Sequence, residues 1–167
     1  MKVLAAVRRP DLVRAEEREW ADANSVSIVD LPTLLRDSDF VSIHAPLTAH
    51  TRGLIGAAEL AMMKPRAVLV NTSRGGIVDE DALASALSGG TIGGAALDVF
   101  ESEPAEVSAL ACLDNVVLTP HLGGATGEAL RTMASAASAD ILQVLAGGRP
   151  VHLVNTGALE RRRLPNG

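Results

Sequence analysis

Short apolar runs alternate along this chain with longer stretches in which apolar residues recur every three or four positions. The short runs predict β-strands and the longer stretches predict helices. The predicted strands are residues 2–7, 26–29, 40–44, 67–71, 95–99 and 115–119. The predicted helices are residues 12–23, a short helix capped by Asp30, 57–63, 80–88 and a long helix from Thr126 or Gly127 to 146. Strands that alternate with helices are typical of an α/β fold with a parallel sheet.

Several local signals refine this pattern. Asp79 has the position and chemistry of an N-cap for helix 80–88, and the pair Gly89 and Gly90 supplies a left-handed stop. The strand at 40–44 (FVSIH) is nearly all apolar, so we expect it to be covered on both faces. The long helix carries one apolar face, formed by Leu130, Met133, Ala134, Ala137, Ile141, Leu142 and Leu145.

Composition narrows the classes of function. The 167 residues suffice for one domain with a sizeable core, and the net charge of −5 argues against nucleic acid or an anionic membrane as a partner. No stretch has the length and flanks of a signal peptide or membrane span, so we expect a cytoplasmic protein. The single cysteine, Cys112, is predicted to be a small core residue. We expect no metal site, because the spacing of His44, His50 and Asp39 matches no common one.

Polar residues follow three of the predicted strands. Arg74 comes after AVLVN, Glu103 after GAALDV, and His121 after NVVLT. Because ligands bind at the carboxyl ends of parallel strands, we expect these side chains to meet at one edge of the sheet. A histidine can move a proton, an acid can orient it, and an arginine fork can bind a carboxylate. Taken singly, each residue is better explained without catalysis: Arg74 by a surface ion pair, Glu103 as a solvated loop acid and His121 as a hydrogen-bonded loop histidine.

Four longer strings carry a family resemblance. They are HAPLT (44–48), NTSRGGIVDEDAL (71–83), AALDVFESEP (95–104) and TPHLGGAT (119–126). In this order and spacing they closely resemble the D-isomer-specific 2-hydroxyacid dehydrogenase family, which includes glyoxylate and hydroxypyruvate reductases and phosphoglycerate dehydrogenases. The resemblance extends from Met1 to about Asn155.

The resemblance implies a role for each residue in this set. It makes Arg74 the substrate-binding arginine, His121 the proton donor and acceptor, and Glu103 the acid paired with it; Glu101 is the nearby alternative, but the family's acid directly precedes the proline. It implies hydride transfer between NAD(P) and C2 of a small 2-hydroxy or 2-oxo acid. The residues that it places around the cofactor are Ala45, Pro46, Thr72, Ser73, Arg74, Asp98, His121, Leu122, Gly123 and Gly124.

The chain departs from the family at the cofactor's pyrophosphate. A G-x-G-x-x-G turn would present backbone N–H groups there, but no two of the fifteen glycines stand two positions apart. Strand 2–7 resembles the family's second strand, so the sheet lacks its central first strand. Either strands 2–7 and 40–44 pair directly, or both remain as apolar edges. We therefore expect a partial Rossmann-type doubly wound sheet followed by a long C-terminal helix, and a truncated or split gene product.

The end of strand 2–7 bears on the choice of cofactor. Val7 stands where enzymes that prefer NAD place an acid on the ribose, and Arg8 and Arg9 follow it. This favours NADP over NAD, although two arginines at a helix entrance are the alternative interpretation.

The domain prediction divides the chain into three parts. Residues 1–125 form a truncated dinucleotide-binding domain, residues 126–155 form a return helix with a remnant of the substrate domain, and residues 156–167 form a flexible tail.

Two hypotheses compete with an active dehydrogenase. Related folds serve as nucleotide-binding scaffolds or corepressors, although the intact set of Arg74, Glu103 and His121 favours an enzyme. Alternatively, the fragment is inactive alone or is complemented by a partner chain that carries the missing front half. The resemblance also implies a homodimer.

Overall fold

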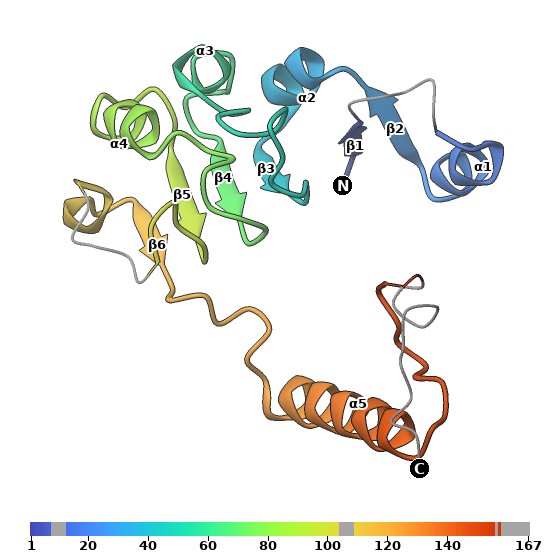
Figure 1. The fold of residues 1–167 in the computed structure, drawn as a ribbon. Coiled ribbons are helices and arrows are strands. Elements are labelled where there is room, and N and C mark those ends of the chain that lie inside the picture. The colour runs from blue at the N-terminus through green and yellow to red at the C-terminus, as the bar shows by residue number, and fades with distance from the viewer. Residues whose placement is uncertain (8–12, 104–108, 156, 158–167) are drawn as a thin grey trace. The chain divides into compact units, whose positions relative to one another are not determined.

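The computed structural model describes residues 1–7, 13–103, 109–155 and 157 (Figure 1). The strands are β1 (Val3–Ala6), β2 (Val26–Val29), β3 (Phe40–Ile43), β4 (Val68–Asn71), β5 (Gly94–Leu97) and β6 (Val116–Leu118). The helices are α1 (Ala15–Ala23), α2 (Leu31–Asp37), α3 (Ala57–Leu60), α4 (Glu80–Ser88), the 3-10 helix η2 (Ala109–Cys112) and α5 (Gly127–Leu145). The predicted strands and helices are all present, most of them shorter at one or both ends. The α/β class is confirmed.

The strands form two parallel sheets. One has the order β1-β2, and the other has the order β3-β4-β5-β6. In the larger sheet Val41 is in register with Leu69, Leu69 with Ala95, and Ala95 with Val116. Among the described residues no ladder joins β1 to β3, so these two strands do not pair directly and the second of the two predicted alternatives holds.

The core lies on one face of the four-stranded sheet. Val41, Leu69 and Ala95 point to that face and pack with Leu60 of α3 and Leu83 of α4. Fully burying one such leucine stabilises the fold by about 1.5–3 kcal/mol relative to leaving it exposed. Helix α4 is fixed at its start as predicted, because the Asp79 carboxylate accepts the Ala82 N–H at 2.9 Å.

The opposite face of this sheet is only partly covered within the described residues of the first unit. Phe40 of β3 is 74% exposed and Val117 of β6 is 63% exposed, while Ser42 is exposed between two buried neighbours. The prediction that strand 40–44 is covered on both faces is therefore wrong. The strand instead alternates between a buried and an exposed side, because the core cluster packs against one face only.

Cys112 is a second correction. It lies exposed in η2, whereas Leu110 of the same short helix is buried in the core. A 3-10 helix of four residues can turn only part of its surface inward. Here the leucine takes that position, and the prediction of a buried cysteine is wrong.

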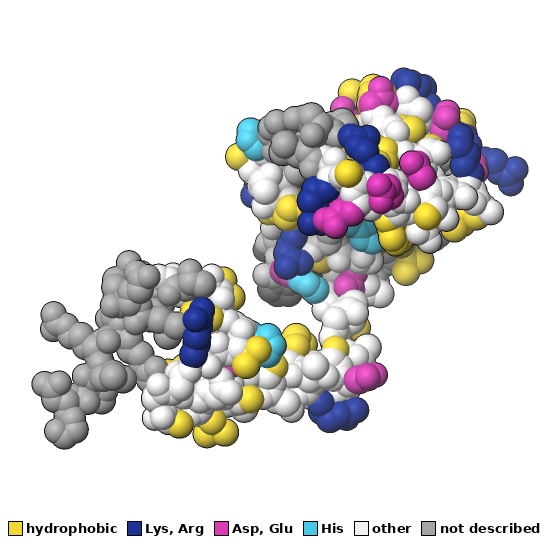
Figure 2. Space-filling model, turned by 90° about the vertical axis from the view of Figure 1, so that its right-hand side faces the viewer, with side chains coloured by type: hydrophobic (Ala, Val, Ile, Leu, Met, Phe, Trp, Pro, Cys, Tyr) yellow, Lys and Arg dark blue, Asp and Glu magenta, His cyan; other side chains and the backbone are white. Residues whose placement is uncertain are grey.

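Residues Gly123–Gly167 form a separate compact unit from Met1–Leu122. Thr126 caps α5 by accepting the Ala129 N–H at 3.1 Å, and Gly147 follows the helix with φ +82°. None of the residues of α5 is buried. Hydrophobic side chains therefore lie at the surface of this unit, while acidic and basic side chains are interspersed on the visible face of the molecule (Figure 2). No helix in the described ranges could cross a membrane.

Candidate active site

The loop after β4 is shaped by a buried asparagine. Asn71 is 2% exposed, and its Oδ1 accepts the backbone N–H and the hydroxyl of Ser73 at 3.1 and 2.9 Å. Its Nδ2 donates to the Arg74 carbonyl at 2.9 Å. One side chain thus satisfies three polar groups of the turn and holds Arg74 at the carboxyl end of β4.

The next residue, Gly75, lies directly against the loop that follows β5. A Cβ atom at this position would stand 1.8 Å from the carbonyl oxygen of Phe100 and 2.6 Å from the nitrogen of Glu101. Both neighbours are backbone atoms, which cannot move aside cheaply. The close packing of these two loops therefore requires glycine.

The loop after β6 is held by Asp98. This carboxylate is 6% exposed, and its Oδ1 accepts the Thr119 hydroxyl at 2.6 Å and the Leu122 N–H at 2.8 Å. Between them His121 adopts φ +56°, in the left-handed region that is strained for residues other than glycine. Such strain costs on the order of 1–3 kcal/mol and is concentrated at functional sites.

His121 forms a pair with Glu103. Its Nδ1 lies 2.9 Å from Glu103 Oε2, while Oε1 of the same carboxylate accepts the Phe100 N–H at 3.1 Å. These two hydrogen bonds, first that to His121 and then that to Phe100, hold the pKa of Glu103 below its ordinary value, and the charges of His121 and Arg74 add to them. Glu103 is thus ionised at neutral pH.

The pairing fixes the chemistry of the imidazole. An ionised carboxylate can only accept a hydrogen bond, so the Nδ1 that faces it carries the proton. The lone pair of neutral His121 is then on Nε2. This is the arrangement needed for a histidine that exchanges a proton with a substrate oxygen.

The three predicted catalytic side chains line one pocket. Its volume is about 270 Å³, and its walls are Leu47, Arg74, Gly75, Phe100, Glu101, Glu103 and His121. The structure therefore brings Arg74, Glu103 and His121 together. Arg74 Nη1 donates to the Ser73 carbonyl at 2.6 Å, which orients the guanidinium. Leu47 and Phe100 were not predicted, because an apolar residue in a loop gives no signal that distinguishes a pocket wall from a core contact.

An adjoining pocket is lined by five of the predicted cofactor residues, Ala45, Pro46, Thr72, Ser73 and Arg74. It has a volume of about 550 Å³ and is lined by His44, Ala45, Pro46, Leu47, Thr72, Ser73 and Arg74. Leu47 and Arg74 line both pockets, so the two lie next to each other. Asp98 lies behind the His121 loop and accepts the Leu122 N–H. The side chain of Leu122 is exposed. Gly123 and Gly124 belong to the second unit, and Arg8 and Arg9 lie outside the described residues.

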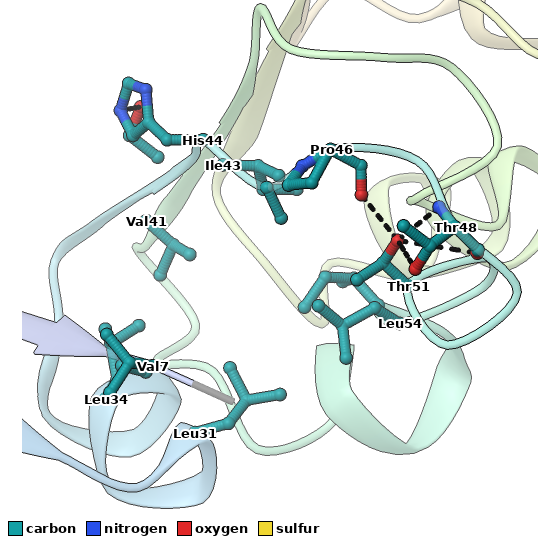
Figure 3. A pocket seen from close by; sticks show the side chains of 14 residues that line it. Val7, Leu31, Leu34, Val41, Ile43, His44, Pro46, Thr48, Thr51 and Leu54 are labelled. Atoms are coloured by element: carbon teal, nitrogen blue, oxygen red, sulfur yellow. Dashed lines mark hydrogen bonds between the residues drawn. The ribbon is translucent and has the colours of Figure 1, made fainter. Parts of the chain in front are cut away.

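Two further pockets begin at the end of β1. One, of about 460 Å³, lies among Val7, Leu31 and Leu34 on one side and Val41, Ile43 and Pro46 on the other (Figure 3). The second, of about 430 Å³, is lined by Ala6, Val7, Asp30, Leu31, Ala45, His50, Thr51 and Leu54. Thr51 stabilises the loop beside them by donating to the Pro46 carbonyl at 2.6 Å. Within the described residues no group of three or more His, Cys, Asp and Glu side chains could hold a metal ion.

A parallel α/β sheet with pockets and a His–Glu pair at the carboxyl ends of its strands defines a ligand-binding domain of the doubly wound class. Comparison with known proteins gives the family. Residues 1–123 match the family model described as "D-isomer specific 2-hydroxyacid dehydrogenase, NAD binding domain". The chain belongs to this family.

Relatives and solved structures agree with that assignment. The chain is 46% identical to the glyoxylate reductase of Thermococcus litoralis over 161 residues, which are 95% of this chain and 46% of that protein. It is 50% identical to glyoxylate/hydroxypyruvate reductase B of Pectobacterium carotovorum over 132 residues, which are 78% of this chain and 41% of that protein. The crystal structure of D-lactate dehydrogenase with NAD+ from Lactobacillus jensenii superposes with a TM-score of 0.79 at 30% identity, covering 92% of this chain and 48% of that one. The chain thus spans about half the length of these relatives.

Proposed function

We propose that this chain supplies the catalytic edge of an NAD(P)-dependent dehydrogenase that acts on a small 2-hydroxy or 2-oxo acid such as glyoxylate or hydroxypyruvate. The observation that carries the proposal is the 2.9 Å contact between His121 Nδ1 and Glu103 Oε2 in a pocket that Arg74 also lines. Membership of the dehydrogenase family and similarity to a glyoxylate reductase support the same substrate class.

Each side chain has a distinct task in this proposal. The guanidinium of Arg74 binds the substrate carboxylate through two parallel N–H groups. When the 2-oxo group is reduced, protonated His121 gives its Nε2 proton to the developing alkoxide, and in the reverse direction Nε2 takes the hydroxyl proton. Glu103 keeps Nδ1 facing away from the substrate and stabilises the charged imidazolium. A nicotinamide held beside this pocket would supply or accept the hydride at C2.

The lining of the pockets fits this cofactor at its two ends. Thr72, Ser73, Ala45 and Pro46 offer hydroxyl groups and an apolar wall beside the catalytic pocket, as a nicotinamide riboside requires. The pocket of about 430 Å³ at Val7 and Leu31 is the site that we propose for adenosine. The sequence contains no glycine-rich G-x-G-x-x-G turn for the pyrophosphate between them.

The direct test follows NADPH and NADH oxidation with glyoxylate and with hydroxypyruvate. His121→Ala should lower kcat by about 10²–10⁴-fold, the usual contribution of a general acid. His152→Ala is a matched control, because His152 Nδ1 also lies 3.0 Å from a carboxylate, Asp140 Oδ2, but outside these pockets. Turnover that survives His121→Ala unchanged would refute the mechanism. Nucleotide binding without turnover would favour the scaffold or corepressor alternative.

We propose NADP rather than NAD as the preferred cofactor. The support is that Val7 stands at the end of β1, where an acid would bind the ribose hydroxyl of NAD, and that Arg8 and Arg9 follow it in the sequence. Replacing both arginines by serine should weaken NADPH binding and leave NADH binding nearly unchanged. Tighter binding of NADH than of NADPH to the unaltered chain would contradict this preference.

We further propose that a second polypeptide segment completes the sheet between β1 and β3. Within the described residues each of these strands has an edge that pairs with no other strand, and the pocket of Figure 3 is lined by β1 on one side and by β3 on the other. An apolar strand followed by a G-x-G-x-x-G turn would pair with both edges and bring phosphate-binding N–H groups. Amide exchange at Leu4 and Ser42 should slow when such a polypeptide is coexpressed. Unchanged amide exchange would refute the proposal. If this chain forms a homodimer by itself, its mass measured in solution would be twice that of the single chain.

A further inference from the structure

The loop that carries Glu103 is attached to the rest of the unit through Glu101. The backbone N–H of Glu101 donates to Glu80 Oε1 at 2.6 Å, and its carboxylate accepts from Arg52 Nη1 at 3.2 Å. Glu80 is the first residue of α4, and Arg52 lies in the loop after β3. Two segments that are distant in the sequence thus converge on a residue two positions before the acid that pairs with His121.

The two attachments differ in strength. Arg52 and Glu101 have side chains that are more than half exposed, and such surface ion pairs contribute little. Glu80 is a partly buried residue, and its carboxylate bonds to a backbone group at short range, so this hydrogen bond is charge-assisted and holds the chain itself. Of the two contacts, the one to Glu80 fixes the loop.

The contact between Glu80 and the Glu101 N–H affects Glu103 because of where that N–H lies in the loop. The preceding N–H, that of Phe100, donates to Glu103 Oε1 at 3.1 Å, so consecutive backbone donors serve two different carboxylates. Without Glu80, the Glu101 N–H would have to turn toward water or compete for Glu103. We expect either change to loosen the Glu103 carboxylate, whose Oε2 lies 2.9 Å from His121 Nδ1.

We infer that Glu80 is a positioning residue, whose carboxylate holds the Phe100–Glu103 loop so that Glu103 meets His121. The inference deepens the proposed function and rests on it for its catalytic meaning. The competing explanation is that Glu80 only places negative charge at the start of α4, as Asp81 beside it does. The first explanation requires the hydrogen bond from the Glu101 N–H to Glu80, whereas the second requires only the negative charge of Glu80.

The test measures the titration of Glu103 directly, by carbon NMR of labelled carboxyl groups in the full chain, with Glu103→Gln identifying its resonance. Glu80→Ala should raise the pKa of Glu103 toward its ordinary value and speed exchange of the Glu101 amide by about tenfold or more, as expected on loss of a hydrogen bond to a charged group. Glu80→Gln keeps the accepting oxygen and should retain both properties. Asp81→Ala removes a charge from the same helical turn and should also leave them unchanged.

An unaltered Glu103 titration in Glu80→Ala would overturn the inference, as would a Glu80→Gln variant that behaves like Glu80→Ala. If Glu80→Ala does not fold, Glu80→Asp takes its place, since it keeps the charge but shortens the side chain by one methylene. The measurement uses neither substrate nor cofactor. A shifted titration without hydride transfer in the wild type would therefore refute the proposed function and leave the positioning role intact.

Discussion

The unit formed by residues 1–122 and the helix α5 both carry apolar faces of regular period, but only the first unit buries its face. Leu69 of β4 is 0% exposed, whereas Leu142 of α5 is 66% exposed. The period of a sequence reports which residues share a face. It does not report whether anything covers that face, because burial depends on segments that are distant in the sequence.

The same two units each hold a histidine beside a carboxylate. His121 lies 2.9 Å from Glu103 and His152 lies 3.0 Å from Asp140. His121 also has a left-handed backbone and lines a pocket with Arg74, whereas Asp140 accepts the N–H groups of Val151 and His152 and so closes a turn onto α5. An ion pair becomes a candidate for catalysis through its surroundings and not through its own geometry.

The largest difference in stability between the two units is expected from truncating Leu69 and Leu142. Leu69→Ala leaves a cavity in the core and should lower the free energy of unfolding by about 2–5 kcal/mol. Leu142→Ala should change it by no more than about 0.5 kcal/mol, because its side chain is already exposed. Chemical denaturation measures both. Equal losses would mean that α5 has a covered face and would remove the contrast.

Glycine substitutions should show the next largest difference. Gly75→Ala places a Cβ 1.8 Å from the Phe100 carbonyl oxygen, so the loops must separate, at a cost of about 1–3 kcal/mol. Gly124→Ala is the control, since no atom lies within 4 Å of the position that its Cβ would take. We expect Gly75→Ala also to raise the pKa of Glu103 as the His121 contact loosens. A Gly75→Ala chain with wild-type stability would contradict the close packing.

A smaller effect distinguishes the helix caps of the two units. Asp79→Ala removes the acceptor for the Ala82 N–H and should destabilise the first unit by about 1 kcal/mol. Thr126→Ala removes the equivalent bond to Ala129, but it should fray α5 without altering the unfolding of the first unit. Thermal unfolding combined with amide exchange separates these outcomes. Loss of stability of the first unit on Thr126→Ala would show that the units unfold together.

The smallest effect is a pH dependence that both units share. The pKa of Glu103 is lowered chiefly by His121, and that of Asp140 chiefly by the Val151 N–H. A carboxyl with a lowered pKa stabilises the folded state above its ordinary pKa, about 4, and loses that contribution as the pH falls through the lowered value. The amide resonances of Phe100 and Val151 should therefore shift only below about pH 4. Glu103→Gln should abolish the first shift alone; a midpoint above the ordinary pKa would refute the assignment.

Much of the site could be predicted from the sequence, because its chemistry follows the ends of strands. Arg74, Glu103 and His121 each stand just after an apolar run, and parallel strands bring such positions to one edge. Glu80 could not be predicted in this role. An acid in the first turn of a helix is favoured by the helix dipole alone. No sequence pattern therefore indicates that Glu80 also bonds to Glu101, 21 residues away.

The errors at Phe40 and Cys112 have a related cause. Both were predicted to be buried because their neighbours are apolar, yet both are exposed. Local hydrophobicity sets the preference for burial, but the number of faces that are covered is a property of the assembled layers.

The sequence by itself determined the α/β class, the order of the strands and helices, the caps at Asp79 and Thr126, and the family, because each depends on local periodicity or on a contiguous string of residues. Tertiary structure alone decided that β1 and β3 do not pair with each other, that Phe40 and Val117 are exposed on one face of the sheet, and that His121 takes a left-handed backbone held by Asp98. These features arise from contacts between segments far apart in the chain, whose energies no local pattern of residues records.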